Sequence, residues 1–471
     1  MDGLECSEIR WSEIKEQTSN YRLDSHYYEK KYVALNQKLL SSPHWLLRDI
    51  VLKPIQTGHT PSMSNSSYYG GKIAFIKTDN LRTNHITNSF NHFLSDEGNR
   101  EISRTELREG DIITTIIGAT EDVIARTALV LEEHLPANIN QNIVQIRVNE
   151  SIVLPEYVNS YLNGIYGRNY LRYLSRQTEQ VNLNCQEVSS VVVPKVSMNF
   201  QNSIRECVIK AYHLQQDSKR EFEIADKLLE GIVNVDVDYS SSITSKSLKS
   251  SLKASGRLDA EYYQPKYDMI ENQLNSSNTV GSTCKIYDNN YIPIDNSIYQ
   301  YIELSNVDTF GGISTPDKML GKELPTRARR FVKEGQVIIS SIEGSLQSCA
   351  LITKELDSSL CSTGFYVIDS DEYNSETLLI FFKSKPIQML MKKRCSGTIL
   401  TAISKEEFFK MPLPYVDSKT QKKIAEKVQK SFKLRKESKQ MLECAVKAVE
   451  MAIESDENTA IMWLEQELEV F

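Results

Sequence analysis

RLDAEYYQPKY occupies positions 257–267, and a closely similar stretch, RLDSHYYEKKY, occupies positions 22–32. The two stretches are identical at seven of eleven positions and begin 235 residues apart in a chain of 471. Three further matches follow in the same order: Phe75–Leu81 with Tyr301–Val307, Glu109–Ile116 with Glu334–Ile342, and Glu187–Ile204 with Glu407–Ile424. The order of these matches predicts that the chain contains two versions of one structural unit.

The composition is that of an ordinary globular protein, with 40% hydrophobic and 25% charged residues. No run of eighteen apolar residues is present, and Met1–Cys6 lacks the basic and apolar segments of a signal peptide. We therefore expect a cytoplasmic protein with no membrane segment. The eight cysteines include no Cys-x-x-Cys pair, which argues against zinc-ribbon, redox and disulfide-scaffold proteins. The net charge of −7 disfavours a uniformly basic surface but allows local positive patches.

The hydrophobic pattern changes along the chain between helical period and short strands separated by turns. Apolar residues at helical spacing predict two long helices, and stripes of this length need a partner helix to bury them. The expected fold class is α+β: two tandem mostly-β domains with helices, separated by two long antiparallel α-helices in a pseudo-twofold arrangement. The expected segments are an N-terminal helical segment (1–45), a β-rich domain (46–197), a central long helix (198–235), a Ser/Lys-rich linker with the helix that begins the repeat (236–279), a second β-rich domain (280–416), and a C-terminal long helix with its tail (417–471).

Known catalytic patterns are missing from the sequence. It contains no phosphate-binding Gly-x-x-x-x-Gly-Lys-Ser/Thr loop, no Gly-x-Gly-x-x-Gly, and no Asp/Asn-Pro-Pro-Tyr/Phe tetrapeptide of amino-methyltransferases. The seven histidines form no His-x-x-x-His pair. We therefore predict that the chain binds a ligand rather than catalysing a reaction, with no catalytic residue and no metal ligand.

The candidate binding residues are polar and basic side chains at the expected turns, because lysine and arginine neutralise phosphates and arginine, asparagine and glutamine read base edges. Three arginines spaced by four residues are predicted on one face of a helix over Pro155–Arg176, where a solvated charged face is an equally good interpretation. In the first domain the candidates are Thr60, Ser62, Ser64, Asn65, Tyr68, Lys77, Thr78, Asn80, Arg82, Arg168, Arg172 and Arg176. In the second domain they are Ser305, Asn306, Arg327, Arg329, Arg330, Lys392, Lys393 and Arg394.

Several short motifs recur in a fixed order: Gly58-x-Thr60-Pro61-Ser62, Tyr69-Gly70-Gly71, Leu107-x-x-Gly110-Asp111, Ala137–Ile143, and Phe408–Pro414 before the last long helix. With these motifs the chain resembles the specificity subunits of type I restriction–modification systems over essentially its whole length. The second half departs from the pattern, because Tyr291–Asp295 stands where the Gly-x-Thr-Pro-Ser opening is expected. This departure leaves the first contact loop of the second domain undefined.

The resemblance implies a non-catalytic subunit for phage defence and DNA methylation. Each β-rich domain would be a target-recognition domain that reads one half of a bipartite site in double-stranded DNA, and the helices would set the gap. Two methyltransferase subunits would dock on the chain and bring S-adenosylmethionine for adenine-N6 methylation, so that the chain itself binds no cofactor. Restriction/translocase subunits would join this complex. Two alternatives are a self-contained DNA modification enzyme and a duplicated scaffold that no longer reads DNA.

Overall fold

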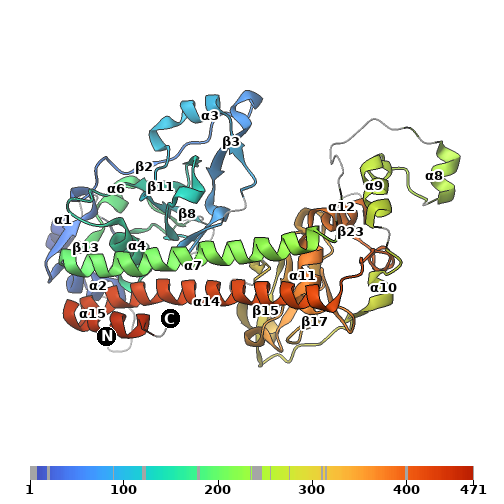
Figure 1. Ribbon diagram of the computed structural model, residues 1–471. Helices are drawn as coiled ribbons and strands as arrows, with labels where there is room; N and C mark the ends of the chain where they lie inside the picture. Colours follow the sequence, from blue (N-terminus) through green and yellow to red (C-terminus); the bar gives the residue numbers. More distant parts are fainter. Residues whose placement is uncertain are drawn as a thin grey trace. The chain divides into compact units, whose positions relative to one another are not determined.

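A computed structural model describes residues 8–17, 22–87, 90–118, 123–177, 181–233, 235, 245, 247–254, 256–274, 276–308, 311–312, 316–397, 401–469 and 471 (Figure 1). The chain forms two compact units, unit 1 from Met1–Leu214 with Glu437–Phe471 and unit 2 from Gln215–Lys436. Most of the serine-rich part of the expected linker lies outside the described residues. The boundaries expected for the six segments remain predictions.

Unit 1 is built from short strands with helices packed on them. A four-stranded sheet has the order β2-β11-β7-β9, and a three-stranded sheet has the order β10-β3-β6. Its strands are β1 (His44–Leu46), β2 (Gln56–Thr57), β3 (Tyr69–Ile76), β4 (Leu81–Arg82), β5 (His85–Ile86), β6 (Phe93–Leu94), β7 (Ile112–Thr115), β8 (Ile117–Gly118), β9 (Thr127–Leu129), β10 (Ala137–Ile139), β11 (Ile143–Ile146), β12 (Val181–Asn182) and β13 (Val192–Pro194). Its shorter helices are α1 (Trp11–Gln17), α2 (Lys30–Leu40), α3 (Asp96–Glu101), α4 (Pro155–Asn163), α5 (Ile165–Leu174), α6 (Cys185–Ser189) and α15 (Glu457–Leu468).

Unit 2 repeats this plan with the sheet orders β14-β21-β18-β19 and β16-β15-β20-β17. Its strands are β14 (Cys284–Ile286), β15 (Ile298–Ile302), β16 (Asp317–Leu320), β17 (Ala328–Phe331), β18 (Val337–Ser340), β19 (Cys349–Leu351), β20 (Leu360–Ser362), β21 (Phe365–Ser370), β22 (Cys395–Ser396) and β23 (Ala402–Ile403). Its shorter helices are α8 (Leu248–Ala254), α9 (Pro265–Leu274), α10 (Val280–Thr283), α11 (Ser375–Lys383), α12 (Lys385–Arg394) and α13 (Lys405–Phe409).

The strand registers confirm the duplication residue by residue. In unit 1 Ile112 lies opposite both Ile146 and Leu129, and in unit 2 its counterpart Val337 lies opposite both Ile368 and Leu351. Each unit also contains one parallel pair, β3 with β10 and β15 with β20. Since a one-residue slip would turn every side chain to the other face, equal registers mean equal core-facing positions.

Two long helices, α7 (Met198–Glu230) and α14 (Ser418–Glu454), complete both units. In unit 1 the Cys207 thiol donates to the carbonyl oxygen of Met441 at 3.3 Å. In unit 2 the Ser218 hydroxyl donates to the carbonyl oxygen of Ser431 at 2.8 Å, and Lys427 pairs with Glu221 at 2.7 Å. These pairings run antiparallel, and the expected fold class, α+β with small sheets and two long helices, is confirmed.

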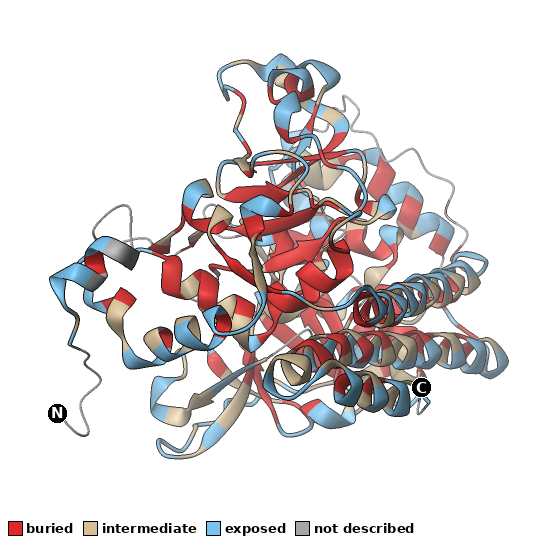
Figure 2. Ribbon diagram, turned by 90° about the vertical axis from the view of Figure 1, so that its left-hand side faces the viewer, coloured by how far each residue is buried: buried red, intermediate tan, exposed pale blue. Residues whose placement is uncertain are grey.

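The apolar core follows the same duplication. Buried residues concentrate in the strands and on the helix faces that cover them (Figure 2). One large cluster in each unit joins the four-stranded sheet, the paired short helices and the long-helix segments, and a smaller cluster lies between the two sheets. No helix among the described residues is both long and apolar enough to cross a membrane.

The single helix expected over Pro155–Arg176 is wrong. The chain forms α4 and α5 with an extended residue, Gly164, between them. A Cβ on Gly167 would lie 2.2 Å from the carbonyl oxygen of Tyr161, so glycine allows α5 to fold back closely on the end of α4. In unit 2 Pro386 stands in the first turn of α12, where proline begins a helix rather than continuing one.

Candidate nucleic-acid interface

The repeated RLD motif closes the end of a helix in both units. The Arg22 guanidinium donates to the carbonyl oxygens of Leu174 (2.6 Å) and Ser175 (2.8 Å) at the end of α5, and Asp24 holds it at 2.8 Å. Arg257 does the same in unit 2, donating to carbonyl oxygens at the end of α12 and pairing with Asp259 at 2.7 Å. A cation suits the negative end of a helix, so the motif is framework rather than binding site.

The leucine of the repeated motif is exposed to solvent in both units. Leu23 is 69% exposed and its counterpart Leu258 is 64% exposed, although both are flanked by the arginine and aspartate of the cap. The second tyrosine of each motif anchors the same backbone, since Tyr28 donates to the carbonyl oxygen of Arg22 at 2.9 Å and Tyr263 to that of Arg257 at 2.8 Å. The leucine is thus held outward on an equivalent surface of each unit.

Several candidate residues of unit 1 lie where the parallel strands β3 and β10 end. Ile76 lies opposite Ile139 in register, and the Asn140 amide donates to the carbonyl oxygen of Ile76 at 3.1 Å. Parallel strands end at the same edge of a sheet. The turn that follows β3 and the exposed Gln141 that follows β10 are therefore neighbours at this edge.

The turn after β3 is fixed by its asparagine. Asn80 is buried, and its Oδ1 accepts a hydrogen bond from the Lys77 amide at 3.0 Å. In unit 2 the Asn306 Oδ1 accepts from the Glu303 amide at 2.7 Å. Asn80 and Asn306, both predicted as DNA contacts, thus form the same turn-stabilising hydrogen bond, while the side chains of Lys77 and Thr78 stay partly exposed.

The loop after β2 reaches the same edge. A Cβ on Gly58 would lie 2.0 Å from the carbonyl oxygen of Ile139, so only glycine passes here without displacing the backbone. Two residues later the Thr60 hydroxyl donates to the Gln141 side chain. Beyond this crossing Asn65 caps the 3₁₀ turn Ser66–Tyr68 at 3.2 Å. Ser62 and Ser64 are exposed in this loop, Asn65 and Tyr68 are partly exposed, and the two serine hydroxyls lie 2.8 Å apart.

Basic side chains surround the hairpin that follows the turn. Arg82 donates to the carbonyl oxygen of Asp79 at 2.8 Å, and Arg126 approaches that of Leu81 at 3.4 Å. From α5, Arg168 reaches the Thr83 hydroxyl at 3.4 Å. The hairpin itself is held by Asn84, which has a positive φ of 57°. Arg126 was not predicted as a contact, because only the folded hairpin brings it next to Arg82.

The equivalent edge of unit 2 carries a different set of side chains. Glu303 begins the turn after β15, the Ser305 hydroxyl donates to its carboxylate, and Arg327 pairs with it at 3.5 Å. The exposed Thr363 follows β20, and its amide donates to the carbonyl oxygen of Arg327 at 2.8 Å. Arg327 is itself 59% exposed in its side chain. The edge therefore offers acceptors and donors that differ from those of unit 1.

Other candidates of unit 2 lie in packing contacts. Lys393 pairs with Asp268 (3.2 Å) and Glu271 (2.9 Å), and Arg394 pairs with Glu271 at 2.7 Å. Burial raises the pKa of Glu271, but the charges of Arg394 and Lys393 lower it below its ordinary value overall. Lys392 lies 4.0 Å from Glu261. These contacts tie α12 to α9 and the turn before it.

The four remaining candidate arginines differ in their contacts within the protein. Arg329 donates to the carbonyl oxygen of Thr326 at 2.9 Å, and Arg330 donates to that of Phe365 at 2.5 Å. Arg172 lies on α5 and is partly exposed. Arg176 follows the end of α5 and pairs with Glu187 at 2.8 Å. The predicted arrangement of three arginines on one helix face is therefore wrong for Arg176, because α5 ends at Leu174.

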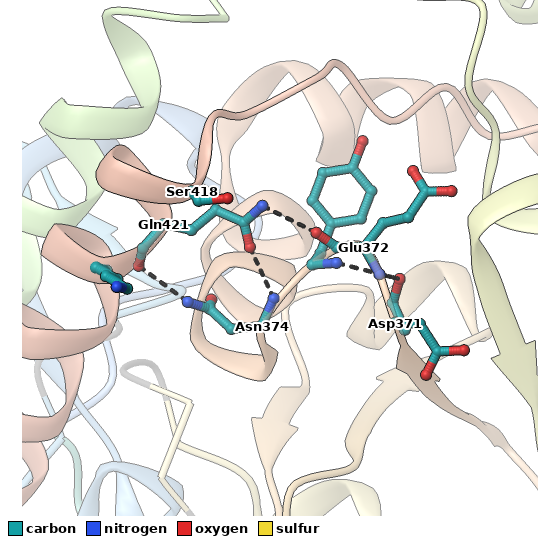
Figure 3. A pocket seen from close by; sticks show the side chains of 8 residues that line it. Asp371, Glu372, Asn374, Ser418 and Gln421 are labelled. Carbon is teal, nitrogen blue, oxygen red and sulfur yellow. Dashed lines mark hydrogen bonds between the residues drawn. The ribbon is translucent and has the colours of Figure 1, made fainter.

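A glutamine at the start of each long helix connects it to the short helix pair. Gln201 accepts from the Leu154 amide and Gln421 from the Asn374 amide, each at 2.8 Å. Figure 3 shows Gln421 facing Asn374 and the backbone of Glu372 at an open surface pocket. Asp371, Glu372 and Lys422 line this pocket, and their net negative charge disfavours a phosphate there. Among the described residues, no cluster of His, Cys, Asp or Glu could hold a metal ion.

The chain is similar in sequence to a protein of known function. No family model matches the chain. The chain is 23% identical over 185 residues to the type I restriction enzyme EcoBI specificity subunit of Escherichia coli, and this match covers 38% of each protein. The chain thus spans about 38% of the length of that curated relative. This similarity confirms the resemblance to type I specificity subunits that the motifs predicted.

Solved structures of similar proteins cover most of the chain. The S subunit of a type I restriction–modification system from M. genitalium is 11% identical, with 90% of this chain and 95% of that one covered and a TM-score of 0.36. The HsdS subunit from Thermoanaerobacter tengcongensis is 15% identical, with 88% and 97% covered and a TM-score of 0.29. A chain from a study of complex assembly and conformational transition of the type I R-M system is 14% identical, with 89% and 97% covered and a TM-score of 0.28.

Proposed function

We propose that this chain is a non-catalytic DNA sequence-recognition subunit of a type I restriction–modification complex. One observation carries the proposal: two units share strand registers and turn geometry, yet expose different polar side chains at the same sheet edge. A shared scaffold with different contact residues suits the reading of two different DNA half-sites. The similarity to a type I specificity subunit supports the same conclusion.

In unit 1 the proposed DNA surface combines base-reading and phosphate-binding side chains. Gln141 can form a bidentate pair with adenine, and lysine and arginine can donate to guanine or to phosphate. The proposed contacts are Thr60, Ser62, Ser64, Asn65, Tyr68, Lys77, Thr78, Arg82, Arg126, Gln141, Arg168 and Arg172. Asn80 supports this surface through the turn, without contacting DNA itself.

In unit 2 the proposed surface is centred on the Glu303 turn. Ser305 and Arg327 touch Glu303, and Thr363 is linked to Arg327 through the backbone. Arg329 flanks this group on β17, an edge strand. The charged cluster Lys392–Arg394 is left out of the proposed surface because Asp268, Glu271 and Glu261 already pair with it.

The remaining parts of the proposal concern the complex. Each unit reads one half of a bipartite site in double-stranded DNA, and α7 with α14 sets the gap between the halves. Two methyltransferase subunits dock on the chain and bring S-adenosylmethionine for adenine-N6 methylation. Restriction/translocase subunits join this assembly. Duplicated surfaces of one chain support two copies of one partner, since each surface offers the same contacts.

The test is co-expression of the chain with the methyltransferase subunit of the same host. Mass photometry of the purified complex is expected to show two methyltransferases for each copy of this chain. Sequencing of methylated adenines in the host is expected to show a motif split by a fixed gap. The chain alone is expected to transfer no methyl group. Failure to form a complex, together with no split methylation motif, would overturn the proposal.

A further inference from the structure

We propose that the residues at positions 77 and 303 determine which base is read in the two half-sites. Lys77 reads a guanine in the first half-site, and Glu303 reads a cytosine in the second. This inference rests on the proposed function and goes beyond it by assigning the choice of base to one position in each unit. Both residues begin the turn that follows the central parallel strand of their unit.

The two turns have nearly the same backbone. Lys77 has φ −119° and ψ 174°, and Glu303 has φ −108° and ψ 175°. Four residues later Leu81 has φ −91° and ψ 132°, and Val307 has φ −90° and ψ 123°. Each first residue donates its amide to the asparagine three positions on, at 3.0 and 2.7 Å. The backbone therefore points both side chains in the same direction from the scaffold.

The strands below the turns are equally matched. Phe75 lies opposite Asn138 and Ile76 opposite Ile139, while Tyr301 lies opposite Leu360 and Ile302 opposite Cys361. Phe75, Ile76, Tyr301 and Ile302 are all buried. The residue that follows each pair is the first to leave the core at the carboxyl end of its strand. What differs between the two units at this point is the chemistry of the side chain.

That chemistry is opposite in the two units. A lysine ammonium offers only donors, whereas an ionised glutamate offers only acceptors. The Lys77 Nζ lies 5.7 Å from the centre of the Phe75 ring, and within the described part of the chain no carboxylate pairs with it. The Glu303 carboxylate accepts from Ser305 and pairs with Arg327, yet its side chain remains 33% exposed. Two oxygens accept about four hydrogen bonds, so acceptor capacity remains.

These two groups fit opposite members of a G·C pair in the major groove. Guanine presents the acceptors O6 and N7, which lysine reads, and cytosine presents its N4 amino donor, which glutamate reads. Ser305 and Arg327 hold the Glu303 carboxylate in one orientation, which favours a directional hydrogen bond from a base donor. The turn backbone is therefore the same in both units, while the side chain that reads the base differs.

The experiment compares Lys77→Glu and Glu303→Gln in the chain co-expressed with its methyltransferase. Lys72→Glu is the matched control, because Lys72 is exposed on the same strand and the charge change is identical. Sequencing of methylated adenines is expected to show one changed base position in the first half-site for Lys77→Glu, and one in the second for Glu303→Gln. The preference should shift about tenfold or more, with the other half-site and the gap unchanged.

A variant that no longer methylates DNA is tested by binding instead. The affinity of its purified complex is measured for duplexes that each carry one substituted base pair. A preference that shifts at one base pair supports the inference, while an equal loss on every duplex shows that the residue does not discriminate between bases and overturns it. Unchanged motifs in both variants, with a split motif in the parent protein, also overturn it. A parent protein without any split motif contradicts the proposed function instead, so the two failures are distinguishable.

Discussion

Gly58 shows how one residue controls the recognition edge of unit 1. Its missing Cβ allows the loop after β2 to pass the carbonyl oxygens of Ile139 and Asn140, which would lie 2.0 and 2.5 Å from a Cβ. Thr60 can then reach Gln141. The glycine therefore links the fold to the proposed contact residues.

Gly58→Ala is expected to displace this loop and to destabilise unit 1 by about 1–3 kcal/mol, the usual effect of overpacking. Urea unfolding followed by hydrogen exchange across residues 58–69 measures the change. Gly344→Ala is the matched control, since no atom lies within 4 Å of a Cβ there and no positive φ is required. Equal stability and equal exchange in the two variants would contradict the predicted close crossing.

At the scale of elements, α12 depends on the ion pairs that join it to α9. Glu271 holds Lys393 and Arg394, whose side chains are only 7% and 10% exposed. Removing the carboxylate leaves two nearly buried cations without this partner. The cost of breaking a fully buried pair is about 3–5 kcal/mol. Glu271 is itself 31% exposed, so a smaller loss of about 2–3 kcal/mol is expected.

Glu271→Gln is therefore expected to lower the unfolding free energy of unit 2 at pH 7. The folded-state pKa of Glu271 is lowered, so its stabilisation is present above the ordinary glutamate pKa of about 4.3 and is lost as pH falls through the lower folded value. Urea midpoints at pH 7 and pH 3 should thus differ less in the variant than in the parent. Asp371→Asn, which breaks an exposed pair with Lys285, should have little effect. A Glu271→Gln effect no larger than this control would contradict the prediction.

The same cluster shows where sequence reasoning fails. Lys392–Arg394 form a dense basic run, which the sequence presents as a binding patch. The neutralising carboxylate of Glu271 lies more than a hundred residues earlier, so only the packing of α9 against α12 brings it close. Gln141 was missed for a related reason. The parallel pairing of β3 with β10 brings it to the same edge as the turn after β3, where Thr60 donates to it, and no local pattern encodes that pairing.

Other elements were predictable because their signals are local or repeated. The apolar stripe through Ile204, Val208 and Ala211 predicted α7, and each of these residues is buried. The duplication was predictable because the residues that are identical in the two copies have the same structural role in both. Arg22 and Arg257, for example, each cap a helix end. The break between α4 and α5 was not, since it depends on how closely Gly167 approaches Tyr161.

At the scale of the whole molecule, duplication implies paired docking surfaces. A residue kept in both copies is explained when it stabilises both units, as the cap arginines and aspartates do. Leu23 and Leu258 are also kept, yet they are 69% and 64% exposed. Burying an exposed leucine against a partner contributes about 1.5–3 kcal/mol. The proposed complex supplies such a partner, one methyltransferase subunit for each leucine.

Leu23→Asp and Leu258→Asp are each expected to reduce the complex from two methyltransferases to one, and the double variant is expected to bind none. The reason is that a carboxylate in an apolar contact is strongly unfavourable, while an exposed position tolerates it in the free chain. Mass photometry at one fixed concentration measures the stoichiometry, and thermal unfolding of the free chain checks the fold. Leu52→Asp is the control, because Leu52 is 62% exposed but lies outside the repeated motif. If the double variant still binds two methyltransferases, the leucines have no docking role. If instead each single variant loses both subunits, the two surfaces do not act independently, and the duplication is not the origin of the stoichiometry.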